Sequence, residues 1–121
     1  MFIILIIMAD MIFPLIPNAA ADANSGPGAV SVTTYFTELT TTGADAFTLA
    51  DGTKVGQLKK IILVSDGGDA TLTPATFVDG STVTFADVGD YVVLIYTGDG
   101  AGWRAIETGN DADGVSGPVI A

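Results

Sequence analysis

The strongest pattern in the chain lies in residues Phe47–Ile106, FTLADGTKVGQLKKIILVSDGGDATLTPATFVDGSTVTFADVGDYVVLIYTGDGAGWRAI. Short runs of β-branched and apolar residues alternate here with Asp-Gly turns. Glycine accepts the positive φ that tight turns require, and β-branched residues favour extended backbone. This block therefore predicts a series of short strands.

The same pattern extends toward the N-terminus and gives about seven strands at 8–12-residue spacing, which is typical of a small β-sandwich or barrel. Asp66–Asp69 is expected to form a tight hairpin turn. The sequence predicts an all-β fold, a small antiparallel sandwich or barrel with an extended N-terminal arm. The expected strands are Ala29–Leu39, Phe47–Leu49, Gln57–Ser65, Ala70–Thr73, Ser81–Ala86, Tyr91–Thr97 and Gly102–Glu107.

Three parts of the chain differ in composition. Residues 1–28 combine an apolar arm with a linker of small and polar residues that is interrupted by Gly-Pro. Residues 29–108 form the expected β-domain, and residues 109–121 form a C-terminal tail. We expect one domain, because 121 residues bury only a modest core.

The N-terminal arm begins with the wholly apolar run Phe2–Met8. A secretory signal is disfavoured because no Lys or Arg precedes the run, Asp10 interrupts it, and Pro14 and Pro17 break it. A membrane span is also not expected, since that needs about 18 or more uninterrupted apolar residues. An extended run of this composition needs burial on both faces, either in a neighbouring subunit or against its own domain.

Composition narrows the function classes. Lys and Arg number 4 against 14 Asp and Glu, and the net charge of -10 argues against nucleic-acid binding. The chain has no His and no Cys, so the usual zinc sites and thiol chemistry are not expected. No nucleophile has a partner base, so we expect neither an enzyme nor a cofactor. Calcium is a weak alternative, because the Asp residues in the turns lack EF-hand spacing.

Two further features indicate burial, either in the core or in a subunit contact. Tyr91–Tyr96 is apolar at every position, so it is either central in a two-sheet core or has one face in an interface. Trp103 is expected to fill a core or an interface. Lys59 and Lys60 are expected to protect a strand edge from unwanted pairing. The candidate interface residues are Phe2, Ile3, Ile4, Leu5, Ile6, Ile7, Tyr91, Val93, Ile95 and Trp103.

The order of motifs resembles small β-rich virion proteins of tailed, marine-type bacteriophages. The resemblance rests on the turn and strand signatures in Leu49–Ile61, Asp66–Pro74, Gly80–Asp90 and Gly102–Trp103, and it covers about half the chain. Members of this group serve as capsid decoration or cement proteins and as fibre modules, often as trimers. The resemblance implies no catalytic set.

The resemblance implies a virion protein on the capsid surface. We expect a capsid decoration or cement protein that forms a homo-oligomer, most simply a trimer, and contacts the major capsid protein or another virion protein. A head or tail fibre component is the alternative. A secreted or surface filament subunit, with the N-terminal segment as donor strand or signal, is the alternative from another class and implies an extracellular location.

Overall fold

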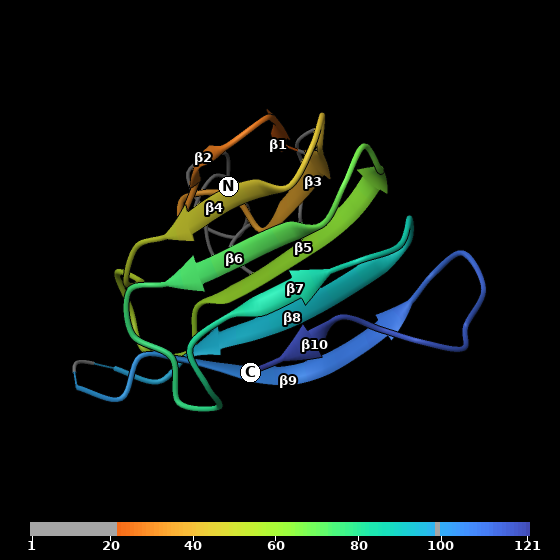
Figure 1. Ribbon diagram of the computed structural model, residues 1–121. Coiled ribbons are helices and arrows are strands. Elements are labelled where there is room, and N and C mark those ends of the chain that lie inside the picture. Colours follow the sequence, from red (N-terminus) through yellow and green to blue (C-terminus); the bar gives the residue numbers. More distant parts are fainter. Residues whose placement is uncertain (1–21, 99) are drawn as a thin grey trace, which may run out of the picture.

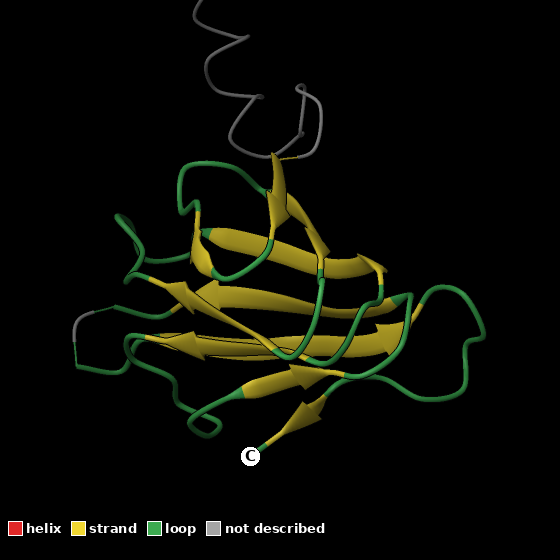
Figure 2. Cartoon of the chain, turned by 45° about the horizontal axis from the view of Figure 1, so that its top comes forward, coloured by secondary structure: helices red, strands yellow, loops and turns green. Residues whose placement is uncertain are grey.

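The computed structural model describes residues 22–98 and 100–121, which form ten strands and no helix (Figures 1 and 2). The strands are β1 (Asp22–Ser25), β2 (Gly28–Val30), β3 (Phe36–Thr40), β4 (Asp45–Leu49), β5 (Leu58–Ser65), β6 (Ala70–Pro74), β7 (Val83–Phe85), β8 (Asp90–Tyr96), β9 (Trp103–Asn110) and β10 (Val119–Ile120).

Two five-stranded sheets pack face to face. Sheet A has the order β1-β3-β5-β8-β9, and sheet B has the order β10-β7-β6-β4-β2. Figure 1 shows the two layers, with the last strands of each sheet, β9 and β10, near one end of the sandwich. Apolar side chains that alternate along the strands fill the space between the layers, as in other β-sandwiches.

The first six strands alternate between the sheets. After each of β1 to β5 the chain crosses to the other sheet, so the next strand in the same sheet runs in the same direction. In sheet A, Asp22 of β1 pairs with Thr37 of β3, which pairs in turn with Ile61 of β5, and all three strands are parallel. Strands β2, β4 and β6 are likewise parallel. Each pair of consecutive strands, β1–β2, β3–β4 and β5–β6, thus makes one turn around the core, which we call a coil. The N-terminal half of the fold is a short stack of such coils, as in a β-solenoid.

Hydrogen bonds from side chains and backbone hold the turns of successive coils together. The Thr41 backbone N–H donates to Ser65 O at 3.0 Å, and its hydroxyl donates to Gly68 O at 2.6 Å. The same hydroxyl accepts the Gly67 N–H at 2.9 Å. Thr41 is buried, and these contacts satisfy its hydroxyl within the stack of turns.

The remaining strands close the sandwich with antiparallel pairs. Strand β7 pairs with β6 and β10, while β8 pairs with β5 and β9. A register shift between Val93 and Leu94 leaves Ile106 of β9 as an extra residue, so β9 carries a β-bulge.

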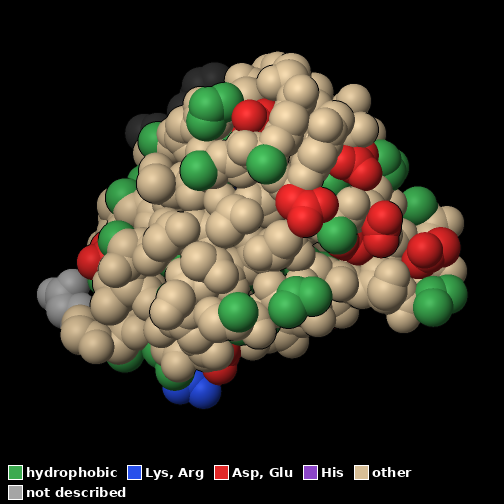
Figure 3. Space-filling view, viewed as in Figure 1, with side chains coloured by type: hydrophobic (Ala, Val, Ile, Leu, Met, Phe, Trp, Pro, Cys, Tyr) green, Lys and Arg blue, Asp and Glu red, His purple; other side chains and the backbone are tan. Residues whose placement is uncertain are grey.

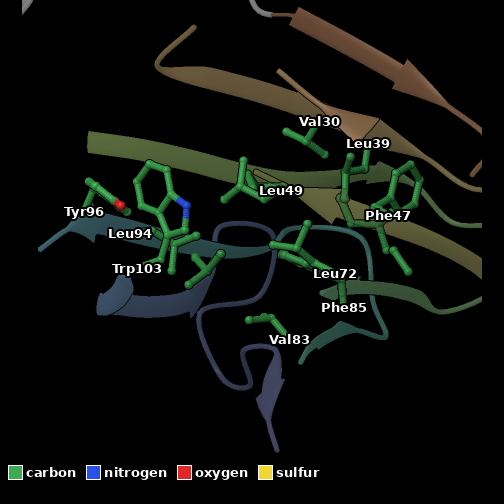
Figure 4. Close-up of a cluster of buried hydrophobic side chains, with 14 residues drawn as sticks. Val30, Leu39, Phe47, Leu49, Leu72, Val83, Phe85, Leu94, Tyr96 and Trp103 are labelled. Atoms are coloured by element: carbon green, nitrogen blue, oxygen red, sulfur yellow. The ribbon is translucent and has the colours of Figure 1, made fainter. Parts of the chain in front are cut away.

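One hydrophobic core lies between the sheets (Figure 4). Trp103 contributes the largest side chain, packs edge-on against Tyr96 at a ring-centroid distance of 5.3 Å, and donates from Nε1 to Ala50 O at 2.8 Å. The core residues are Val30, Leu39, Phe47, Leu49, Ile61, Leu63, Ala70, Leu72, Val83, Phe85, Val92, Leu94, Tyr96 and Trp103.

The all-β prediction is confirmed, whereas the prediction of an antiparallel fold of about seven strands is wrong in detail. The described residues form ten strands in two mixed sheets. Asp66–Asp69 joins β5 of sheet A to β6 of sheet B, so it is a corner between sheets and not a hairpin turn. The prediction failed because Gly-rich turns form both hairpins within a sheet and corners between sheets.

Strand boundaries also differ at the two ends of the chain. The expected strand Ala29–Leu39 is divided into β2 of sheet B and β3 of sheet A. Strand β1 lies within the segment expected to be a linker, and β10 lies within the expected tail. The expected N-terminal arm, including Phe2, Ile3, Ile4, Leu5, Ile6 and Ile7, lies outside the described residues.

Candidate functional site

The carboxylates of the turns act as local hydrogen-bond acceptors. Asp66 Oδ1 accepts the Gly68 N–H at 2.9 Å, and Asp45 Oδ2 accepts the Thr42 N–H at 2.9 Å. Within residues 22–98 and 100–121, no three acidic side chains converge in a group that could hold a metal ion. The Asp-rich turns in this part of the chain therefore shape the backbone.

A shallow hollow of about 480 Å³ lies between residues of β9 and β10 at one edge of the sandwich. Asp79 and Glu107 bring two carboxylates to it. Asp79 Oδ2 accepts the Ala105 N–H at 2.7 Å, and Glu107 Oε2 accepts the Tyr91 O–H at 2.7 Å. Both carboxylates therefore already accept structural hydrogen bonds. The lining residues are Asp79, Ala105, Ile106, Glu107, Thr108 and Ile120.

Lys59 occupies an unusual place for a lysine. It lies on β5, the central strand of sheet A, on the same side as Ile61, and its side chain is fully buried. Its Nζ donates to Thr34 O and Thr34 Oγ1 at 3.0 Å and to Thr37 Oγ1 at 2.5 Å. The prediction that Lys59 protects a strand edge is therefore wrong.

Burial lowers the pKa of the Lys59 ammonium to about 8, and the Asp22 carboxylate acts in the opposite direction. The Thr37 hydroxyl connects the two groups, since it donates to Asp22 Oδ2 at 3.4 Å. Lys59, Thr37 and Asp22 come from β5, β3 and β1, so a polar row crosses the parallel part of sheet A. This row joins the first coil to the rest of the fold.

The outer face of sheet A is the most apolar outer surface formed by strands. Along β8, residues 90, 92, 94 and 96 are buried, while Tyr91, Val93 and Ile95 point outward and are half-buried. Strand β8 therefore packs one side in the core and presents the other on the outside of the sheet. The neighbouring strands add Phe36, Leu58 and Ile62 to the same face.

The register arranges this outer face in three cross-strand rows. One row joins Leu58, Ile95 and Arg104; the next joins Phe36, Lys60, Val93 and Glu107; the third joins Glu38, Ile62, Tyr91 and Gly109. Cross-strand neighbours lie about 4.5–5.5 Å apart at Cβ, so each row is a continuous surface. We call the residues of these three rows the A face.

Charged groups sit among the apolar side chains of the A face. Lys60 Nζ lies 4.5 Å from the Tyr91 ring centroid and 3.5 Å from Asp111 Oδ2. Lys60 therefore pairs with an acid. The prediction that Lys60 protects a strand edge is wrong as well, because β5 is the central strand of sheet A. The Tyr91 pKa is raised, first by its hydrogen bond to Glu107, then by burial and by the charges of Glu107 and Asp111.

The outer face of sheet B differs in composition. Its outward-facing strand residues are small, mostly threonine, and uncharged; they are Ala29, Ala46, Thr48, Thr71, Thr73, Thr84 and Val119. Figure 3 shows this side, where acidic side chains gather toward one end of the molecule. A partner that needs a broad apolar contact therefore has less to bury on sheet B than on the A face.

Four of the ten candidate interface residues lie in the described part of the chain, and the structure brings three of them together and separates the fourth. Tyr91, Val93 and Ile95 form one line along β8, whereas Trp103 is fully buried in the chain's own core. Sequence reasoning missed Ile62, which adjoins Tyr91 on the A face. The uninterrupted apolar run Ile61–Val64 was the available signal, because it implies apolar side chains on both sides of β5.

The described residues contain no helix long and apolar enough to cross a membrane. A comparison with protein-family models gives no match, and a comparison with curated proteins gives none either.

Proposed function

We propose that this chain is a structural virion protein, a decoration or cement module that oligomerises on a phage head and stabilises it. The observation that carries the proposal is the A face, where Tyr91, Val93 and Ile95 form an apolar line on the outside of a tightly fastened body. A half-buried apolar sheet face of this kind suits a protein–protein contact.

The use of polar groups agrees with a structural role. Thr41 and Asp66 satisfy the backbone of their turns, and Asp90 and Asn110 do the same where β8 begins and β9 ends. All of these groups hold the shape of the protein. The acidic surface would keep assembled particles apart in solution.

A fibre component is the second candidate, and one observation favours it. Strands β1 to β6 alternate between the sheets as stacked coils, and elongated β-proteins grow by adding such coils. No described strand lies beyond β1 in sheet A or beyond β2 in sheet B. A fibre would place further coils or another module at this end.

Mass spectrometry of density-purified phage particles carrying this sequence tests the proposal. We expect peptides from residues 55–104 in the particle fraction. The copy number of this chain per particle should be comparable to that of the coat protein for a decoration role and much lower for a fibre. Absence from particles and presence in the soluble lysate would overturn a virion role. An intact mass that corresponds to a chain starting near Ala23 or Asn24 would instead support the secreted filament subunit.

A further inference from the structure

The A face carries charges of both signs in a chain that is strongly acidic overall, and a third acid, Asp111, borders it beside Lys60. The chain has 4 Lys and Arg against 14 Asp and Glu. Two of the four cations, Lys60 and Arg104, lie on the A face together with two acids, Glu38 and Glu107. A second copy would meet like charge over much of the surface, but it meets both signs here.

The positions of these charges have a simple symmetry about β8. Lys60 lies one strand to one side of Val93, and Glu107 lies one strand to the other side in the same row. A two-fold axis along β8, in the plane of contact, therefore places position 60 of one copy opposite position 107 of the other, and the reverse. In such a pair Lys60 exchanges Asp111 of its own chain, 3.5 Å away, for Glu107 of the second copy. The same axis places Val93 opposite Val93.

We propose that the A face is the contact between two copies of this chain, which pair about a two-fold axis along β8. Tyr91, Val93 and Ile95 form the apolar seam of the pair, and two reciprocal Lys60–Glu107 ion pairs border it. Two twisted sheets pack well with their strands nearly aligned, which this arrangement provides. The inference rests on the proposed oligomeric role and replaces the expected trimer with a two-fold pair.

Sedimentation of the purified full-length chain at low ionic strength tests the seam. We expect a dimer for the wild type and a monomer for Val93→Asp, because each pair would bury two facing carboxylates. Thr48→Asp is the matched control, since Thr48 is exposed on the opposite sheet; it should remain a dimer. A monomeric or trimeric wild type, or a dimer that Val93→Asp leaves intact, would overturn the proposal.

Charge exchange tests the axis itself and does not depend on the fold of the Val93 variant. Lys60→Glu alone and Glu107→Lys alone each place like charges opposite one another twice, so each should raise the dimer dissociation constant by about tenfold or more. An equimolar mixture of the two variants restores opposite charges at both contacts and should form heterodimers. A mixture that associates no better than either variant alone contradicts the two-fold axis.

These measurements separate the two proposals. The dimer is measured on the purified chain, whereas the virion role is measured by the presence of the chain in particles. A dimer absent from particles would retain the pairing and refute the virion role. A monomer abundant in particles would retain the virion role and refute the pairing, leaving the A face to bind a different virion protein.

Discussion

The Asp90 carboxylate accepts a 2.8 Å hydrogen bond from the Asn110 side-chain amide, where β8 begins and β9 ends. Both side chains are buried. Asp90 Oδ2 also accepts the Ala86 and Asp87 N–H groups, and Asn110 Oδ1 accepts those of Ala112 and Asp113. The pair therefore fastens two loops to the end of sheet A.

Replacing Asn110 by Leu should destabilise the protein strongly. The change leaves the buried Asp90 carboxylate without its side-chain donor, which costs about 1–3 kcal/mol, and it removes the acceptor for the Ala112 and Asp113 N–H groups nearer the surface. Urea unfolding would measure the loss. Ser116→Ala changes an exposed polar residue in the following loop and should have little effect. Equal stability of the two variants would contradict the role given to the pair.

Glycine at position 67 is required for close approach between coils. A Cβ there would lie 2.3 Å from Thr41 O and 2.9 Å from Thr42 Cα, both backbone atoms. Gly67→Ala must therefore separate the stacked turns, and we expect a loss of about 1–3 kcal/mol in thermal or urea unfolding.

Gly43→Ala is the matched control for this prediction. Gly43 lies in the neighbouring turn, and a Cβ there meets no atom within 4 Å. The substitution should change stability by less than about 1 kcal/mol. If the two alanine variants unfolded at the same urea concentration, the tight stacking at Gly67 would not limit stability.

The buried Lys59 should make stability depend on pH. Its pKa of about 8 lies below the usual 10.5, so the folded protein loses this proton before the unfolded chain does. Unfolding then takes up a proton between these values, and stability rises with pH across that window. Below about pH 8 both states carry the proton, and this contribution is constant.

Lys59→Met isolates that contribution because methionine fills similar space without a titrating group. We expect the free energy of unfolding of the wild type to rise relative to that of the variant from pH 8 to pH 10. Parallel urea titrations at each pH give the difference. A constant difference would mean that Lys59 titrates normally in the folded state.

The sequence predicted strands better than their arrangement. The existence of β5 and β8 and of the glycine-rich segments around them followed from residue patterns alone, and so did the two faces of β8, since side chains point to opposite faces of a strand. The corner at Gly67 did not, because the same Asp-Gly chemistry builds hairpins and crossings between sheets. Only the partner of each strand distinguishes them, and strand pairing is a non-local property.

Lys59 shows the same limit within a single strand. Its position in the alternation of Ile61 and Leu63 places it on the inner side, but its charge argues for an exposed side chain. The side chain is buried because Thr34 and Thr37 supply three acceptors from a neighbouring part of the fold. The outer line of Tyr91, Val93 and Ile95 was predictable, because it depends only on the period of β8.

Trp103 should report on the packing between the sheets. It is the only tryptophan, it is fully buried, and its Nε1 donates to Ala50 O across the core. Trp103→Phe leaves that carbonyl without its donor and leaves part of the indole volume empty, so we expect a loss of about 2–4 kcal/mol. Wild-type fluorescence should be that of a water-excluded indole and should shift to longer wavelength in urea together with the loss of β-sheet circular dichroism. A fluorescence change at lower urea than the circular dichroism change would show that the sheets separate before they unfold.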